Sequence, residues 1–347
     1  MDDPSFPSGG NVYDRRVCDE LRRRGLSVQE AAVAGPWPCP DDDARARLDE
    51  TLGSVADGAT VLMDGLVACG TPGVVLPHTR RLRIAVLVHL PLAEETGLAP
   101  EEARRRDARE RRVLRAVPTV VATSQWAAEH LRARHLLPES RIHVAAPGTD
   151  PAPVAAGTTT GTRLVCVAAL TPRKGQDTLI AALARLRDLD WECLLVGPDE
   201  RDARFADALR STIRRSALTD RVRLLGPRSA TELAEIYHHT DLAVLPSHTE
   251  TYAMVVTEAL ARAIPVLTTT GGALPNTLGE VTEGGVPGIL VPPGEVGALT
   301  SALRMWLTEV DTRRRLRRAA TSRRTTLSGW GETARCMVAA LERTRAG

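Results

Sequence analysis

The sequence predicts an α/β protein with two doubly wound domains, each built on a parallel sheet covered by helices. Short apolar runs alternate with amphipathic stretches along most of the chain, which is typical of βαβ units. Residues 151–162 read PAPVAAGTTTGT, a segment without apolar periodicity that indicates a linker. The 347 residues are enough for two domains of about 100–200 residues.

The first predicted domain covers residues 1–150. Short apolar runs of strand length predict the strands Thr60–Asp64, Ile84–His89, Thr119–Thr123 and Ile142–Ala145. Amphipathic periodicity predicts the helices Val12–Arg24, Glu101–Ala116 and Trp126–His135.

The second predicted domain covers residues 163–310 and repeats the alternation. Its predicted strands are Arg163–Ala169, Glu192–Gly197, Val222–Gly226, Leu242–Pro246, Ile264–Thr268 and Gly288–Val291. Its predicted helices are Asp177–Leu189, Arg204–Ala217, Glu232–His239, Thr251–Ala263 and Glu295–Leu307. The pattern of residues 311–347 predicts two further helices, which we expect to pack back across the cleft between the two domains. Because doubly wound sheets bind ligands at the carboxyl ends of their strands, we expect the site in the cleft between the two domains.

Composition excludes several classes of protein. With 43% hydrophobic and 25% charged residues, the chain is neither disordered nor a coiled coil. No apolar run reaches about 20 residues, so we expect a cytoplasmic protein. Aromatic residues make up 3% and leave few surfaces for stacking bases, so we expect no nucleic-acid partner. The six cysteines are far apart and do not indicate a metal cluster. Acidic residues interleave with the basic ones at 101–112, which favours a solvated helix face over a membrane-binding one.

The strongest motif is SHTETYAMVVTEAL at 247–260. It follows an apolar strand, with Glu250 at the start of a predicted helix and Glu258 two turns further on. The N–H groups at a helix N-terminus suit a phosphate, and a carboxylate beside them would serve another group, such as sugar hydroxyls. The residues that we place against such a phosphate are Thr251, Tyr252, Ala253 and Met254. In the alternative interpretation Glu250 caps the helix and Glu258 is solvated.

A second motif, TPRKGQD at 171–177, joins a predicted strand to a predicted helix. The adjacent cations Arg173 and Lys174 suit a diphosphate, and Lys174 is the only lysine in this arginine-rich chain. The alternative is a basic turn in which Asp177 caps the following helix. After a later strand, Gly271 and Gly272 would let backbone approach a ligand closely.

The first domain offers weaker motifs. Gly9 and Gly10 precede a predicted helix, where glycine allows a phosphate or substrate to approach the backbone, although an ordinary turn explains them equally well. His89 ends a predicted strand and would face the cleft, where an imidazole could bond a sugar hydroxyl or a phosphate. The alternative for His89 is a structural role.

Together these segments resemble a known family. The order of PRKG, LLVG, VRLLG, DLAVLPS, E-x7-E, IPV, GG and GILVPPGE over about 163–307 is similar to the C-terminal domain of the retaining GT-B glycosyltransferases of family 4. The resemblance implies that Glu250 lies by the donor sugar, that Glu258 holds the nucleotide ribose and that Lys174 holds the donor diphosphate. It also implies a glycine-rich loop near the donor phosphates, at Gly9 and Gly10, and a functional histidine near His89.

The chain departs from the family at one position. The family usually reads Gly-Arg after the first strand of this domain, whereas this chain reads Ala168-Ala169. Arg173 is therefore our candidate for the missing cation, and diphosphate affinity is the property that this change affects.

The resemblance implies a retaining transferase that moves a sugar from a nucleotide-diphosphate sugar to an unknown acceptor. We expect Glu250 and His89 at the reacting groups, no cofactor, and no metal, because fixed cations and dipoles can stabilise the leaving diphosphate. Two alternatives remain: a sugar-nucleotide epimerase of the same architecture, and a non-catalytic nucleotide-sugar-binding protein.

A final expectation concerns the beginning of the first domain. A doubly wound domain opens on a central strand that runs into the glycine-rich loop. The residues before Gly9 read MDDPSFPS, and their prolines and acids are unsuited to a buried strand. We therefore expect the first strand to be missing, with the natural start upstream.

Overall fold

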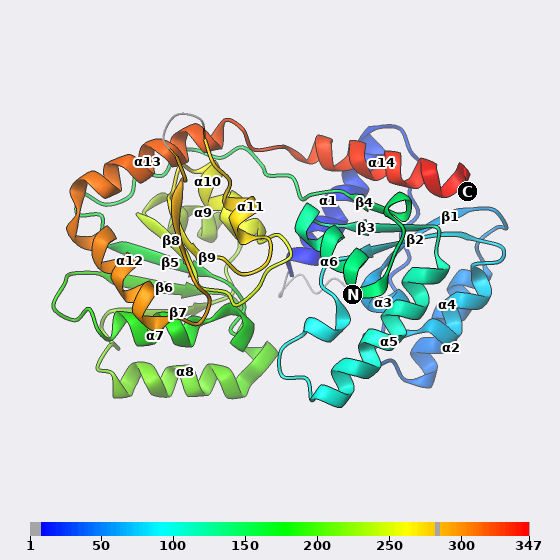
Figure 1. The fold of residues 1–347 in the computed structure, drawn as a ribbon, viewed down its shortest axis with the longest axis horizontal. Helices are drawn as coiled ribbons and strands as arrows, with labels where there is room; N and C mark the ends of the chain where they lie inside the picture. Colours follow the sequence, from blue (N-terminus) through cyan, green and yellow to red (C-terminus); the bar gives the residue numbers. More distant parts are fainter. Residues whose placement is uncertain (1–7, 282–284, 347) are drawn as a thin grey trace. The chain divides into compact units, whose positions relative to one another are not determined.

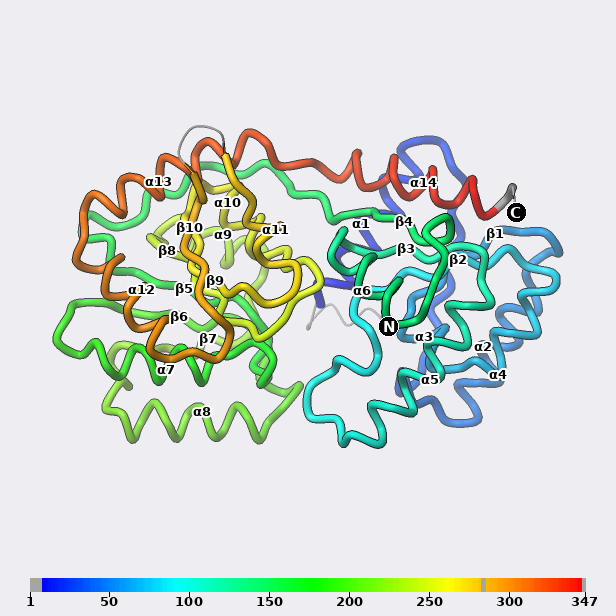
Figure 2. The backbone as a smooth tube through the Cα atoms, in the orientation of Figure 1, coloured from blue at the N-terminus to red at the C-terminus, as the bar shows by residue number. Residues whose placement is uncertain are grey.

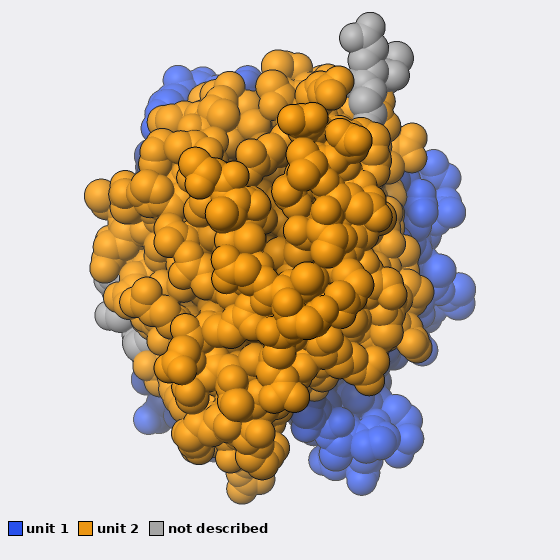
Figure 3. Space-filling view, turned by 90° about the vertical axis from the view of Figure 1, so that its left-hand side faces the viewer, with its two compact units in different colours: residues 1–148, 330–347 blue, residues 149–329 orange. Residues whose placement is uncertain are grey.

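In a computed structural model of the chain, residues 8–281 and 285–346 are described, and they divide into two compact units. Unit 1 comprises Met1–Gly148 and Trp330–Gly347, and unit 2 comprises Thr149–Gly329 (Figure 1, Figure 3). The two tail helices, which the sequence analysis grouped together, are divided between the units: the first stays in unit 2 and the last belongs to unit 1 (Figure 2).

Unit 1 contains a four-stranded parallel sheet whose strands lie side by side in chain order. The strands are β1 (Thr60–Asp64), β2 (Arg83–Val88), β3 (Thr119–Ala122) and β4 (Ile142–Val144). The helices are α1 (Gly9–Arg23), α2 (Asp42–Gly53), α3 (Gly65–Gly70), α4 (Pro72–His78), α5 (Pro100–Ala116), α6 (Gln125–His135) and α14 (Trp330–Ala346). The four predicted strands are confirmed to within a few residues, whereas α2, α3 and α4 were not predicted.

The strand order explains why the C-terminal helix belongs to unit 1. Crossover connections between parallel strands are right-handed. When the strands of a sheet lie side by side in chain order, all the connecting helices therefore lie on one face of the sheet. Helix α14 contacts all four strands, with α1 packed against it, and lies on the side opposite α3, α4 and α5 (Figure 1). A face that would otherwise be exposed is thereby covered, with Ala334, Met337 and Ala340 fully buried.

The expected absence of a first strand falls partly outside the described residues. Met1–Pro7 are not described, and the described residues from Ser8 to Ala59 contain α1 and α2 but no strand. Ser8 caps α1 by accepting a hydrogen bond from the Asn11 N–H at 3.0 Å.

Unit 2 contains a six-stranded parallel sheet in the order β10-β9-β8-β5-β6-β7. The strands are β5 (Arg163–Val167), β6 (Glu192–Val196), β7 (Val222–Gly226), β8 (Leu242–Leu245), β9 (Val266–Thr269) and β10 (Gly288–Val291). The helices are α7 (Gln176–Leu183), α8 (Ala203–Arg215), α9 (Ala230–His238), α10 (Met254–Ala261), α11 (Leu274–Leu278), α12 (Val296–Thr308) and α13 (Val310–Arg324).

This sheet is doubly wound. The chain starts at the central β5, moves outward to β7, and returns to the other side of β5 at β8. Alternate residues of β5 serve separate cores, since Leu164 and Cys166 belong to one apolar cluster and Val165 to another. The strand order reverses between β5 and β8, and the carboxyl ends at such a switch point are where open α/β sheets bind ligands. None of the described helices is both long and apolar enough to cross a membrane.

We predict that Met337→Ala lowers the free energy of unfolding of the protein by about 2–5 kcal/mol, because the fully buried methionine of α14 leaves a cavity. Chemical denaturation followed by circular dichroism measures the change. Arg335→Ala, an exposed position on the same helix, is the control and should change stability by less than about 0.5 kcal/mol. Equal effects of the two variants would show that α14 does not pack on the sheet.

Candidate functional site

Three loops of unit 2 pack closely together at the carboxyl ends of β5, β8 and β9. Two glycines at left-handed backbone angles make this packing possible. A Cβ on Gly175 (φ +67°) would lie 2.2 Å from the Pro246 carbonyl oxygen, and one on Gly272 (φ +66°) would lie 2.2 Å from that of Glu250. Gly271 and Gly272 thus accommodate a neighbouring loop: the Ala273 N–H donates to the Glu250 carbonyl at 2.7 Å.

Glu250 lies where these loops meet, and its carboxylate has three donors. Lys174 Nζ is 2.5 Å from Oε1, Arg173 Nη1 is 3.0 Å from Oε2, and the Ser247 hydroxyl donates to Oε1 at 2.7 Å. The side chain is only 6% exposed. Burial alone would raise its pKa, but the charges of Lys174 and Arg173 lower the pKa to about 2. Glu250 is therefore a carboxylate at neutral pH.

The Arg173–Lys174–Glu250 cluster carries one positive charge in excess, because two cations face one carboxylate. Burial lowers the pKa of Lys174 while Glu250 opposes that shift. The two basic residues are only about one sixth exposed. An excess charge in such a setting interacts strongly with an anion, because the local dielectric constant is lower than that of water.

Helix α10 begins later than the sequence predicts. The predicted start placed Glu250 at the helix mouth, but Ala253 takes a left-handed conformation (φ +71°) and the helix begins at Met254. Glu250 therefore binds the two cations rather than capping the helix. Within the described residues no side chain caps α10 at Ala253. The helix begins four residues after Glu250, and a helix N-terminus favours anions, as the cationic cluster does.

Glu258, on α10, is half-buried and does not point freely into solvent. The Tyr237 hydroxyl lies 3.4 Å from its Oε2, and the guanidinium of Arg262 stacks on the Tyr237 ring at 4.7 Å. Burial raises the pKa of Glu258 above its ordinary value, and Arg262 opposes that shift. The alternative that Glu258 is simply solvated is wrong.

In unit 1, His89 follows β2 directly and is held by α1. Its Nε2 lies 2.8 Å from Asp14 Oδ1, and its ring meets the Tyr13 ring edge-on at 5.1 Å. A Cβ on Gly10 would lie 3.3 Å from the imidazole, so the glycine leaves room for His89. The structure thus brings together two predicted site residues, Gly10 and His89, while Gly9 opens the same helix.

Asp64 joins this group from the end of β1, where it caps α3 by accepting the Leu66 N–H at 2.6 Å. One ligand atom from each of Asp14, Asp64 and His89 lies within 4.8 Å of the others. Burial alone would lower the pKa of His89, but the two carboxylates raise it above the usual value. Sequence reasoning missed both aspartates. Two signals were available in the sequence. Asp64 stands at the carboxyl end of a predicted strand, and Asp14 lies about one helical turn after Gly10.

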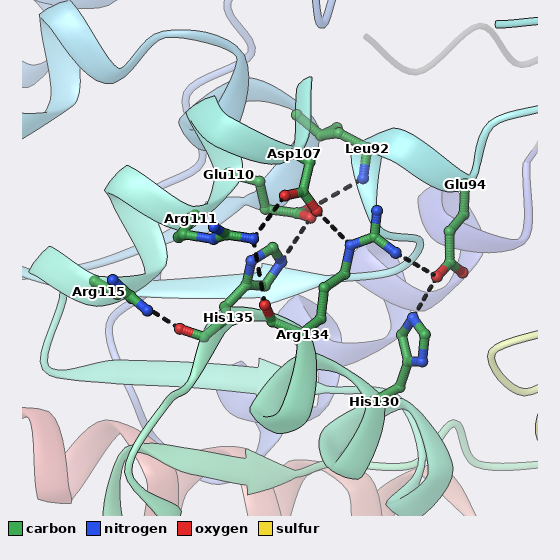
Figure 4. A network of polar contacts seen from close by, with 9 residues as sticks. All are labelled: Leu92, Glu94, Asp107, Glu110, Arg111, Arg115, His130, Arg134 and His135. Carbon is green, nitrogen blue, oxygen red and sulfur yellow. Dashed lines mark hydrogen bonds and ion pairs between the residues drawn. The ribbon is translucent and has the colours of Figure 1, made fainter. Parts of the chain in front are cut away.

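A polar network anchors the loop that follows His89 (Figure 4). Glu110 on α5, fully buried, accepts the Leu92 N–H at 3.1 Å with one oxygen, and its other oxygen lies 3.0 Å from Nε2 of the equally buried His135. Two residues further along the loop, Glu94 pairs with His130 and Arg134 of α6. The loop after His89 is therefore attached to two helices, which restricts the position of the imidazole.

Two hollows, of about 560 and 460 Å³, lie apart from both clusters. The larger is lined by residues of β6, β7 and α9, including Leu194, Arg223 and Ile236. The smaller is lined by residues of α2, α3, α4 and α5 and of the loops that flank them. Neither is lined by a predicted site residue.

The comparisons with known proteins agree with this architecture. The pattern described as "Glycosyl transferases group 1" matches residues 156–323, and that described as "Glycosyltransferase Family 4" matches residues 59–153. The two parallel-sheet units are those of the GT-B glycosyltransferase fold. The chain belongs to the group 1 glycosyltransferases.

Among its relatives are proteins named D-inositol 3-phosphate glycosyltransferase. That of Kineococcus radiotolerans is 31% identical over 275 residues, and that of Jonesia denitrificans is 29% identical over 270 residues. Both alignments cover 72% of this chain and 62% of the relative, so the chain spans about three fifths of their length.

Solved structures share the fold at lower identity. Sucrose-phosphate synthase from Thermosynechococcus elongatus is 21% identical with a TM-score of 0.77, over 98% of this chain and 94% of that one. Anabaena Alr3699/HepE, solved in complex with UDP and glucose, is 18% identical with a TM-score of 0.75, over 98% of each chain.

We predict that Glu110→Ala frees the loop after His89, because it removes the acceptor for the Leu92 N–H and the partner of His135. The free energy of unfolding should fall by about 3–5 kcal/mol, the usual cost of breaking a buried pair. Hydrogen exchange should show faster exchange of the Leu92 amide.

Glu110→Gln is the matched control, because its amide oxygen can still accept the Leu92 N–H. The Leu92 amide should therefore remain protected in this variant. Equal protection of Leu92 in the wild type and in Glu110→Ala would show that Glu110 does not anchor the loop.

Proposed function

We propose that the chain is a retaining glycosyltransferase that moves a sugar from a nucleotide-diphosphate sugar to an acceptor. The observation that carries the proposal is the Arg173–Lys174–Glu250 cluster, with its excess positive charge, beside the N-terminus of α10. This cluster lies at the switch point of a doubly wound sheet, where such folds bind nucleotides.

The proposed donor follows from the charge of this cluster. A diphosphate would receive hydrogen bonds from Lys174 and Arg173 and from the backbone N–H groups around Ala253 and Met254. The same groups would stabilise the charge that develops when the sugar leaves, so the proposed reaction needs no metal and should proceed in excess EDTA. The HepE structures, which contain UDP or UDP-glucose, support a nucleotide sugar as the donor.

Within this scheme the two glutamates have different tasks. Glu250, which is ionised and held by three donors, is the proposed contact of the donor sugar. Glu258, half-buried on α10, is the proposed partner of the nucleotide ribose. His89, in unit 1, is the proposed contact for a sugar hydroxyl, and Gly9 and Gly10 give access to backbone N–H groups beside it.

A direct test uses a panel of nucleotide sugars. Binding should raise the melting temperature of the protein for one class of donor, following RT ln(1 + [L]/Kd). NMR of the product formed from that donor should show the donor's anomeric configuration retained. Inversion would contradict the retaining mechanism, release of a free epimer would indicate an epimerase, and binding without turnover would indicate a non-catalytic protein.

We predict that Glu250→Gln lowers kcat by about 10²-fold, because the amide keeps the shape of the side chain but loses the charge that acts on the sugar in the transition state. Steady-state kinetics with the identified donor measures the effect. Glu235→Gln, an exposed position on α9, is the matched control. Wild-type turnover in the Glu250→Gln variant would show that Glu250 is not part of the active site.

Lys174→Met should weaken UDP binding by about 1.5–3 kcal/mol, the range for hydrogen bonds to charged groups, and should leave uridine binding unchanged. Isothermal titration calorimetry with the two ligands measures the difference. Arg214→Met, exposed on α8, controls for the loss of a cation. Equal losses of affinity for UDP and for uridine would show that the substitution disturbs the structure of the site and that Lys174 does not bind the diphosphate specifically.

A further inference from the structure

Tyr237, near the end of α9, is a fully buried aromatic residue whose hydroxyl meets Glu258. Its ring belongs to the apolar cluster of unit 2 that includes Val256, Ala259 and Leu260 of α10. A phenol hydroxyl in such a setting needs a hydrogen-bond partner. Within the described residues that partner is Glu258 Oε2, at 3.4 Å. The position of the Glu258 carboxylate is therefore tied to the core of unit 2.

Arg262, which follows α10 directly, holds the phenol ring in place. Its guanidinium lies over the Tyr237 ring, 4.7 Å from the ring centroid, and its Nη1 donates to the Glu258 carbonyl at 2.9 Å. The three residues thus form a closed set, in which the hydroxyl meets the carboxylate while the guanidinium meets both the ring and the backbone of Glu258. Because the ring is fixed relative to α10, its hydroxyl restricts the orientation of the Glu258 side chain.

This contact leaves Glu258 with one oxygen for a ligand. Oε2 lies against the Tyr237 hydroxyl, whereas Oε1 has no hydrogen-bond donor within the described residues. A carboxylate oxygen accepts hydrogen bonds only, so its natural partner is a hydroxyl or an N–H group of a ligand.

The hydroxyl of Tyr237 also favours the ionised form of Glu258. Burial raises the pKa of Glu258 and the Asp150 carboxylate acts in the same direction, whereas Arg262 and the Tyr237 hydrogen bond oppose the rise. A donated hydrogen bond stabilises a carboxylate more than it stabilises the neutral acid. Removing the hydroxyl should therefore raise the pKa of Glu258 further.

We propose that Tyr237 is a positioning residue, which directs the Glu258 carboxylate so that Oε1 accepts a hydroxyl of the donor's ribose. This inference rests on the proposed function, because it assumes that a nucleotide binds beside Glu258. Tyr237 is fully buried, so it acts through Glu258 and not by touching the nucleotide. A carboxylate that is already oriented avoids the entropy cost of immobilising a side chain when the ligand binds.

Tyr237→Phe removes the hydroxyl and keeps the ring that Arg262 covers, so the variant should fold. Thr240→Val is the matched control, because Thr240 is also buried, lies three residues further along the chain, and donates to the Ile236 carbonyl at 2.8 Å. Glu258→Ala, alone and combined with Tyr237→Phe, completes the set of variants.

The probes are UDP and 2′,3′-dideoxy-UDP, which lacks both ribose hydroxyls. Their dissociation constants are measured on the full chain by isothermal titration calorimetry. The wild type should bind UDP about tenfold or more tightly than the dideoxy analogue, because a site that accepts a hydroxyl discriminates against a ligand without it. Tyr237→Phe should bind UDP about fivefold more weakly and the analogue equally well, so that the preference falls to about threefold or less. Thr240→Val should keep the full preference.

A double-mutant cycle decides whether Tyr237 acts through Glu258. In the Glu258→Ala background, Tyr237→Phe should cause no further loss of UDP affinity, because the contact that it affects is already absent. Additive losses of affinity would overturn the inference. A Tyr237→Phe variant that keeps the full preference for UDP, or that loses affinity for both ligands equally, would also overturn it.

NMR of the Glu258 carboxyl carbon, recorded without nucleotide, tests the contact itself. The pKa of Glu258 should rise in Tyr237→Phe and stay unchanged in Thr240→Val, and an unchanged pKa in Tyr237→Phe would overturn the inference. Binding of UDP to the wild type reports on the proposed function, whereas the pKa of Glu258 and the preference for UDP over its analogue report on Tyr237. The two proposals can therefore fail separately.

Discussion

A carboxylate held between two cations organises the candidate donor site. Glu250 draws Lys174 and Arg173 together, and with them two loops that start from β5 and β8. A third loop, after β9, reaches the Glu250 backbone at Gly272. Each of these contacts depends on the others, since an unpaired charge at this depth would be costly. The site is therefore fixed before any ligand binds, which is the condition for electrostatic stabilisation of a leaving group.

The two polar clusters contain different charged groups. Unit 2 presents an excess cation at a helix N-terminus, whereas unit 1 surrounds His89 with carboxylates. The excess cation is the reason why the proposed donor phosphates are placed at the unit 2 cluster.

Much of the architecture could be predicted from the sequence, because strand-length apolar runs and the linker leave local signals. Lys174 and Glu250 could be named as candidates for the same reason, because an isolated lysine and a spaced acidic pair are visible in the sequence. The pairing of Glu250 with Arg173 and Lys174 was not predicted, because it depends on Ala253 adopting a left-handed conformation that delays the helix. Asp14 and Asp64 were missed because strand order and helix packing bring them together. The role of α14 depends in the same way on the strand order of the unit 1 sheet.

In the proposed donor site, Glu250 neutralises one of two cations that would otherwise both face the donor diphosphate. The affinity of UDP for Glu250→Gln, measured by calorimetry at low salt beside the wild type, tests it most directly. Removing the carboxylate's charge doubles the excess positive charge, so UDP should bind more tightly than to the wild type, by about tenfold, and the gain should diminish as salt is added. Unchanged or weaker binding of UDP by a folded Glu250→Gln variant would contradict this role of Glu250.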